Sequence, residues 1–482
     1  MKIQATIMFA VLAAIGPAAT LSWKPYTYTT GDRPAVKIEG EITRVDAPEN
    51  HAAPDGRKVQ LALMRLRSSG ASATTPILYL HGGPGNAGIQ LLGAREFRDL
   101  FEAMRAAGDV LLLDQRGCGL SAPSLLPKEP LQLTGAALAT RESFLAVLEK
   151  HSRAERDRLL REGVDPAQYT IPASVHDIEA VRVALGVPRL RLVGHSYGTQ
   201  LAQAYLRQFP DRVERAVLIG PEGLDMTWKM PAESDAQLRR IAAWAAASPA
   251  AAPAMPDMLG TLRRVLEKLD AQPVRFTYRP EQGEPMQFEV GGFALRFIIA
   301  KFYLGDPVNS RFLPKLLDEL DKGRTPMSLV YNLGQMSGSG LSYTWITTDA
   351  ATGVAAPRRA EIQRQESQSV LGVALNFPIT ELNAVWQVPD LGEEFRRPVT
   401  SDVPVLFVAG TEDGLTPPEQ ARSILTGFPR GAVLVVEGGG HVSQLAAPGL
   451  ARAVADYLAG GTPPGKIAMP LPEFAPLITP RK

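Results

Sequence analysis

Short runs of apolar residues recur along the chain and predict buried strands. Two stretches near the start, 34–45 and 57–67, alternate apolar and polar residues and predict strands with one covered face. Continuous apolar runs follow at 76–80, 109–113, 190–193, 216–219, 403–409 and 432–436. Runs of this kind are typical of strands in a parallel sheet that is covered on both faces.

Segments in which apolar residues recur at helical spacing separate most of these strands. They lie at 94–107, 174–185, 198–209, 419–425 and 447–458. When strand and helix alternate, right-handed crossovers place the strands side by side in one sheet. The pattern therefore predicts an α/β protein with a mostly parallel, doubly wound sheet.

One long stretch, 221–400, interrupts this alternation. It holds few signals of buried strands and several helical segments, among them 232–247, 256–269, 293–303 and 358–371. We predict that 221–400 is an inserted, mainly helical lid, and that 20–220 and 401–482 together form one catalytic domain. A smaller insertion, about 122–170, follows the strand predicted at 109–113.

Composition and charge narrow the function classes. Of the 482 residues, 45% are hydrophobic and 21% are charged, which is typical of a globular protein. The 51 basic and 50 acidic residues give no electrostatic reason to expect a nucleic acid or an acidic membrane as partner. Cys118 is the single cysteine, and the sequence has neither HExxH nor a histidine cluster. We therefore expect no disulfide within the chain, no metal and no other cofactor.

The first residues are typical of a secretory signal peptide. Lys2 precedes an apolar run at 5–15, and small residues follow from Gly16 to Thr20. We predict that residues 1–19 are removed on export to the periplasm or the medium. The run is shorter than the roughly 20 residues that span a bilayer, and no later stretch is apolar enough to do so. The sequence does not indicate an oligomeric state.

Residues 194–198 read Gly-His-Ser-Tyr-Gly and lie between the strand predicted at 190–193 and the helix predicted at 198–209. A G-x-S-x-G sequence in this position is typical of a nucleophile elbow, a tight turn that raises the serine hydroxyl above the sheet. Ser196 is thus the candidate nucleophile. The alternative is an ordinary glycine-rich turn with an exposed serine.

A serine nucleophile needs a base and a carboxylate that orients it. Among the six histidines, His441 follows the last predicted strand, at the sheet edge where Ser196 emerges. Asp413 comes just after the strand at 403–409 and beside Gly414, so we favour it over Glu412. The order Ser, Asp, His along the chain is that of α/β hydrolases. Taken singly, each of these residues could be an ordinary loop residue.

Backbone N–H groups must stabilise the oxyanion that forms when the serine attacks. We predict that one is the N–H of Tyr197, the residue after the nucleophile. The loop after the strand at 76–80 reads His-Gly-Gly-Pro-Gly, and its glycines allow a close approach of the backbone to a substrate. Gly83 of this loop is the second candidate donor; the alternative is a tight turn.

Several longer motifs resemble a family of serine exopeptidases that includes prolyl and tripeptidyl aminopeptidases. They are HGGPG (81–85), DQRGCGLS (114–121), GHSYGT (194–199), PENHAAPDGRKVQLALMRL (48–66) and GTEDGLTPP (410–418). The resemblance implies an α/β hydrolase fold and release of residues from a free peptide amino terminus. Prolyl aminopeptidases usually carry Trp after the nucleophile, where this chain has Tyr197. The signal peptide and long lid are also more similar to the tripeptidyl-aminopeptidase-like branch.

The same family binds the substrate amine with acidic residues that lie mostly in the lid. Glu222, just past the strand at 216–219, is our candidate for this role, and a solvated loop acid is the alternative. The leading hypothesis is an exported serine aminopeptidase that acts through an acyl-enzyme on peptides. An esterase or another small-molecule serine hydrolase could use the same core. A binding protein with an idle triad is a further alternative.

Overall fold

The computed structural model of the chain describes residues 21–70, 75–279, 284–324, 327–338 and 342–476. The predicted signal peptide, residues 1–19, lies outside the described residues, so its removal and the export of the chain stay predictions. Within the described part of the chain, no helix is long and apolar enough to cross a membrane.

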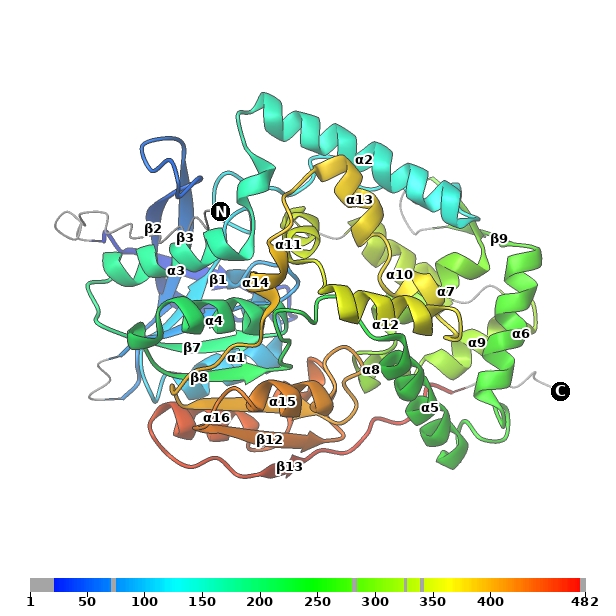
Figure 1. Cartoon of the computed structure of the whole chain (residues 1–482). Helices are drawn as coiled ribbons and strands as arrows, with labels where there is room; N and C mark the ends of the chain where they lie inside the picture. The colour runs from blue at the N-terminus through cyan, green and yellow to red at the C-terminus, as the bar shows by residue number, and fades with distance from the viewer. Residues whose placement is uncertain (1–20, 71–74, 280–283, 325–326, 339–341, 477–482) are drawn as a thin grey trace, which may run out of the picture.

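Ten strands form the central sheet of the described residues, in the order β1-β2-β3-β5-β4-β7-β8-β11-β12-β13 (Figure 1). Their bounds are β1 Lys24–Thr29, β2 Lys37–Pro48, β3 Lys58–Leu66, β4 Ile77–Leu80, β5 Val110–Leu113, β7 Leu190–His195, β8 Val213–Ile219, β11 Val405–Gly410, β12 Gly431–Glu437 and β13 Lys466–Ala468. The pairs β1–β2, β2–β3 and β3–β5 are antiparallel, and all other neighbours are parallel. The predicted fold, an α/β sheet that is mostly parallel, is confirmed.

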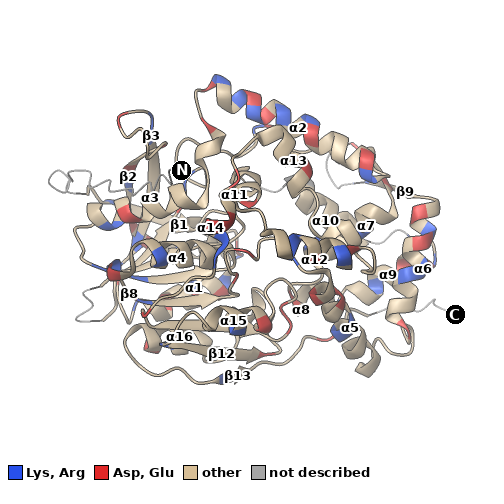
Figure 2. Cartoon of the chain, in the orientation of Figure 1, with Lys and Arg blue, Asp and Glu red and all other residues tan. Residues whose placement is uncertain are grey.

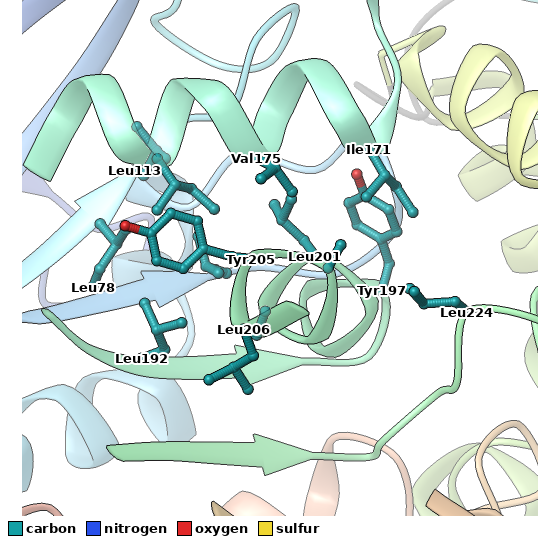
Figure 3. Packing of buried hydrophobic residues seen from close by; sticks show 14 of the residues in the cluster. Leu78, Leu113, Ile171, Val175, Leu192, Tyr197, Leu201, Tyr205, Leu206 and Leu224 are labelled. Carbon is teal, nitrogen blue, oxygen red and sulfur yellow. The ribbon is translucent and has the colours of Figure 1, made fainter. Parts of the chain in front are cut away.

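Helices cover both faces of this sheet. They are α1 Arg95–Met104 and α16 Leu450–Leu458 on one face, with α3 Ile171–Ala184, α4 Tyr197–Gln208 and α15 Pro418–Leu425 on the other. Alternate residues of a strand point to opposite faces, so Leu78 packs with α3 and α4 whereas Tyr79 packs with α1. Figure 3 shows Leu78 and Leu192 of the sheet facing Tyr205 of α4. Burying a leucine in this way stabilises the fold by about 1.5–3 kcal/mol.

Local sequence explains where these helices stop. The helix α4 ends at Gln208, two residues before Pro210, which has no N–H to continue the helix. The helix α3 is followed by Gly186 at φ +67°, a left-handed conformation that glycine adopts at low cost just past a helix end.

A second layer lies to one side of the sheet and forms the lid (Figure 1). Its helices are α5 Pro231–Ala247, α6 Met258–Ala271, α7 Gly292–Phe302, α8 Pro307–Ser310, α9 Leu313–Asp321, α10 Met327–Gly338, α11 Thr344–Thr352, α12 Ala356–Glu366, α13 Ile379–Trp386 and α14 Gly392–Arg396. Many of their apolar side chains share a hydrophobic core separate from the two that flank the sheet. The mainly helical character predicted for 221–400 thus agrees with its elements.

The lid also draws on residues outside 221–400. A small sheet in it has the order β6-β10-β9, formed by β6 Gly135–Leu138, β9 Val274–Tyr278 and β10 Met286–Val290. The long helix α2 Arg141–Arg161 follows β6 and packs against α13. Basic and acidic positions alternate along α2 (Figure 2), where Arg158 pairs with Glu155 and Glu162. The sequence pattern did not indicate β6, β9 or β10, and the boundaries predicted for the lid stay a prediction.

The end of the described chain returns to the lid. After β13 the chain runs past the sheet toward α5 (Figure 1). The ring of Phe474 packs on that of Trp244 at a tilt of 40°, with 4.0 Å between centroids, and Ala475 N–H donates to the Arg311 carbonyl at 3.2 Å. Residues 474–475, far beyond β12 in the sequence, therefore help to hold the lid in place.

Candidate active site

The candidate nucleophile lies on a sharp turn between β7 and α4. Ser196 has φ +56° and ψ −129°, a conformation that side chains adopt rarely and that marks a strained functional turn. Its N–H donates to the Ile219 carbonyl at 2.9 Å. A Cβ atom on Gly194 would lie 2.6 Å from the Gly198 carbonyl oxygen, and one on Gly198 would overlap the Leu80 carbonyl. The spacing of the two glycines in G-x-S-x-G therefore follows from steric contact.

The candidate acid and base meet at the same edge of the sheet. The Nδ1–H of His441 donates to Oδ2 of Asp413 at 2.7 Å. Asp413 has no exposed surface, and its Oδ1 accepts the N–H groups of Leu415 and Thr416, both at 2.9 Å. The Thr416 hydroxyl donates to Oδ2 at 2.5 Å. Asp413 is thus held in one orientation and in turn orients the imidazole.

Burial and pairing act in opposite directions on this acid–base pair. Burial would raise the pKa of Asp413, but the facing His441 and the bonds from Thr416 outweigh it and lower that pKa. Burial would lower the pKa of His441, but the charge and hydrogen bond of Asp413 outweigh it and raise that pKa. The pair therefore favours an imidazolium next to a carboxylate, the state that a general base reaches after taking a proton.

Ser196 and His441 lie on adjacent loops. The Nε2–H of His195 donates to the His441 carbonyl at 2.9 Å, and the two imidazole rings are 5.1 Å apart. Burial, aided by His441, lowers the pKa of His195 to about 4, which keeps it neutral. Among the described residues, the Ser196 hydroxyl makes no hydrogen bond to His441. In free enzymes this catalytic bond is often long and shortens when substrate binds.

The glycine loop after β4 lies against the nucleophile. A Cβ atom on Gly82 would lie 2.6 Å from Ser196 Cβ and 3.2 Å from Ser196 Oγ. Gly83 has φ +121°, and its Cβ position faces Asn86 rather than the serine. Gly82, which the sequence did not single out, is therefore the glycine that permits the close approach. Gly83 and Tyr197 as oxyanion donors stay predictions.

Glu222 lies beside the nucleophile turn. Its N–H donates at 2.9 Å to the Thr199 hydroxyl, which donates at 2.7 Å to the Ser196 carbonyl. Its carboxylate is not free, because Lys229 Nζ donates to Oε1 at 2.5 Å. Both side chains are largely buried, with 10% of Glu222 and 18% of Lys229 exposed. Glu222, the candidate predicted from the sequence, thus lies near the site but is already paired with the ammonium group of Lys229.

Two lid residues extend this charged cluster. Asp349 lies on α11, and burial, with the charge of Glu222, raises its pKa to about 8. Lys301 lies near the end of α7 and is exposed, and its charge interacts with those of Asp349 and Lys229. The charges of Glu222 and Lys229 also act on His441. The sequence did not indicate Asp349, Lys301 or Lys229, because no motif marks these residues. Their elements come together only in the folded chain.

Two residues of the DQRGCGLS motif are buried in the fold and take no part in the candidate active site. Cys118 is buried, and burial raises its pKa to about 12, so it is an inert thiol rather than a nucleophile. Arg116 of the DQRGCGLS motif is fully buried and pairs with Asp177 at 2.6 Å, joining that loop to α3. Within the described residues, no group of three or more His, Cys, Asp or Glu side chains is arranged to hold a metal ion.

Comparisons with known proteins agree with this architecture. The family model for the alpha/beta hydrolase fold matches residues 75–448. The serine protease Hip1 of Mycobacterium tuberculosis is 28% identical over 209 residues, which are 42% of this chain and 39% of that protein. The tripeptidyl aminopeptidase of Streptomyces coelicolor is 31% identical over 186 residues, which are 36% of this chain and 34% of that protein. The alignments thus span well under half the length of these curated relatives.

Among solved structures, the crystal structure of a proline iminopeptidase from Mycobacterium smegmatis superposes on the chain with a TM-score of 0.41 and 17% sequence identity. The superposition covers 86% of this chain and 98% of that one.

Proposed function

The chain belongs to the alpha/beta hydrolase fold family, and from that premise we propose that it is a serine aminopeptidase that cleaves peptides near a free amino terminus. The observation that carries the proposal is the 2.7 Å contact between His441 Nδ1 and Asp413 Oδ2, beside a serine at φ +56° on the turn from β7 to α4. Two aligned relatives, a serine protease and a tripeptidyl aminopeptidase, support the peptidase assignment.

In the proposed mechanism, Ser196 Oγ attacks the scissile carbonyl carbon. Asp413 occupies Nδ1 of His441, so Nε2 is the nitrogen that takes the serine proton. The N–H groups of Tyr197 and Gly83 would hold the oxyanion, and each such donor contributes about 2.7–4 kcal/mol to the transition state. The imidazolium then gives its proton to the leaving amine. His441 next takes a proton from a water molecule, which attacks the carbonyl carbon of the acyl-enzyme. The imidazolium then returns this proton to Ser196 Oγ as the acid product leaves.

We assign recognition of the substrate amine to the carboxyl groups of Glu222 and Asp349. The charge of Glu222 raises the pKa of Asp349, which means that the two groups repel when both are ionised. An ammonium group between them would relieve this repulsion and draw Asp349 into its charged form. The lid that carries Asp349 would restrict access to peptide ends.

We also propose that the enzyme is exported, because residues 1–19 are typical of a signal peptide.

One observation favours a second candidate, an esterase or other small-molecule hydrolase. Lys229 already neutralises Glu222 at 2.5 Å, so a neutral acyl group would meet little net charge there. Fold and triad are common to both functions, and only substrate preference separates them.

The test is a panel of chromogenic substrates for the purified mature chain. It compares aminoacyl and tripeptidyl arylamides, the same compounds with an acetylated amine, and simple aryl esters, with Ser196→Ala as the inactive control. The proposal predicts that acetylation lowers kcat/KM at least tenfold. Turnover of esters alone would refute the aminopeptidase and support the second candidate. Activity that survives Ser196→Ala would refute both.

A further inference from the structure

A short lid segment touches both loops that carry the candidate acid and base. It joins α7 to α8 and comprises Leu304, Gly305 and Asp306, which we call the 304–306 segment. The Leu304 carbonyl accepts the Gly414 N–H at 3.0 Å, next to Asp413. The Gly305 carbonyl accepts the N–H of His441 itself at 2.6 Å. The lid thus contacts the main chain of the base directly.

Asp306 makes the most extensive of these contacts. Its Oδ2 accepts the N–H groups of Val442 and Ser443 at 3.1 and 2.7 Å, just after the base. Its Oδ1 accepts the N–H of Val308 at 3.0 Å, at the start of α8. Asp306 is 9% exposed, so water competes little for these bonds. One carboxylate therefore joins the lid to the loop of His441.

Glycines lie on both sides of the contact between the lid and the loop of His441. A Cβ atom on Gly440 would lie 2.8 Å from Asp306 Cα, and one on Gly305 would lie 2.7 Å from Leu415 Cδ1. The clash at Gly440 is with the main chain of the lid, so only glycine there permits the approach, whereas the Leu415 side chain could move away from a Cβ atom on residue 305. Gly440, directly before His441, therefore has a role in lid docking as well as in the turn.

We propose that Asp306 is a positioning residue for the reaction, and that the docked 304–306 segment holds His441 and Asp413 in register with Ser196. The inference rests on the proposed serine-hydrolase function. If the proposal is right, displacing the lid at this point lowers the rate of the chemical step and does not only broaden the range of substrates that the site accepts. A shift of about 1 Å in a catalytic group can cost roughly 10²-fold in rate.

The competing explanation is that Asp306 only caps α8. Two substitutions separate these roles. In Asp306→Ser, the shorter side chain can still cap the helix, as serine commonly does, but it does not reach the amides of Val442 and Ser443. In Asp306→Asn, the shape is kept, and the carboxamide oxygen can still accept the N–H groups of Val442 and Ser443 while the NH2 group faces the Val308 N–H, so the loop contact is kept and the cap is lost.

Asp257 provides a matched control. It caps the lid helix α6, where its Oδ1 accepts the Gly260 N–H at 2.9 Å, and within the described residues no hydrogen bond joins its side chain to a catalytic loop. Asp257→Ser therefore changes the same residue type in the same structural role without touching the base.

The experiment compares the wild type with Asp306→Ser, Asp306→Asn and Asp257→Ser. It measures Tm, kcat and KM on the best substrate of the panel, the rate of labelling by a fluorophosphonate probe, and hydrogen exchange of residues 438–446. We expect Asp306→Ser to lose about 10- to 100-fold in kcat and labelling rate, with KM changed less than threefold and faster exchange in 438–446, and Asp306→Asn to stay closer to the wild type in all of these. Asp257→Ser should match the wild type in all of these except Tm.

The proposal is overturned if Asp306→Ser labels and turns over at the wild-type rate, or if Asp257→Ser loses as much. If both Asp306 variants fail to fold at a temperature where Asp257→Ser is native, Asp306 is a residue of general stability and the proposal also fails. The failure of the proposed function looks different: the wild type itself would then not be labelled at Ser196, or would not prefer free amines. Exchange of 438–446 still reports on Asp306 in that case.

Discussion

Replacing Asp413 by asparagine tests the candidate triad with almost no change of shape. The asparagine oxygen can still accept the N–H groups of Leu415 and Thr416, which now bond to Oδ1. The NH2 group would then replace Oδ2, which accepts from His441 Nδ1 at 2.7 Å. An NH2 group is a donor, so Nδ1 must become the acceptor and the ring proton must move to Nε2. In that tautomer His441 cannot take the serine proton.

The expected loss is about 10⁴-fold in kcat, the size that this substitution has in a serine-protease triad. At 1.36 kcal/mol per factor of ten, this is about 5.4 kcal/mol of transition-state stabilisation. The pH profile should change as well. Asp413 raises the pKa of His441 above its usual value, so the wild-type rate should fall as pH drops through a value above 6.5. Without that charge, burial lowers the pKa and moves any remaining acid limb to lower pH.

The assay is kcat/KM between pH 4 and 9 for the wild type, Asp413→Asn and Glu412→Gln. Glu412 is the neighbouring acid of the same loop, and it contacts Thr411 rather than His441. Glu412 is half-buried and lies outside the acid–base pair, so its variant should stay within about twofold of the wild type. Should Asp413→Asn keep more than a tenth of the activity with an unshifted acid limb, Asp413 does not orient the base.

Three further outcomes are expected. Gly198→Ala should lower the free energy of unfolding by about 3 kcal/mol in urea titrations, because the added methyl group overlaps the Leu80 carbonyl; an unchanged midpoint would contradict the close turn. Asp177→Asn leaves the fully buried Arg116 without its ion pair and should cost about 3–5 kcal/mol, measured in the same way; a cost under 1 kcal/mol would refute the role of the pair. Asp349→Asn should raise KM about tenfold for arylamides with a free amine and leave the acetylated arylamides unaffected; equal effects on both would remove Asp349 from amine recognition.

The strands that carry the candidate triad were predictable because the sequence patterns that mark them are local. The apolar runs, glycines and prolines that mark β7, β11 and β12 are contiguous in sequence, and they set where each strand ends. In a parallel sheet those ends share one edge. Ser196, Asp413 and His441 each lie within four residues of the end of a strand, so their convergence could be inferred before any contact was known.

Some features carried weaker signals. The lid strands β9 and β10 have only five residues each, and β6, which pairs with β10, lies more than a hundred residues earlier, so no local pattern revealed that sheet. The loop with two adjacent glycines was recognised, but only the packing against Ser196 distinguished Gly82 from Gly83.

The sequence by itself determined the α/β alternation, the strain-bearing turn and the three candidate catalytic side chains, because backbone preference and hydrophobic period act over a few residues. Tertiary structure alone decided what surrounds them. Lys229 neutralises Glu222. Asp349 and Lys301 join the cluster from separate helices, and Asp306 binds the loop that follows the base. These pairings depend on how the lid docks on the sheet, a long-range arrangement that no short pattern encodes.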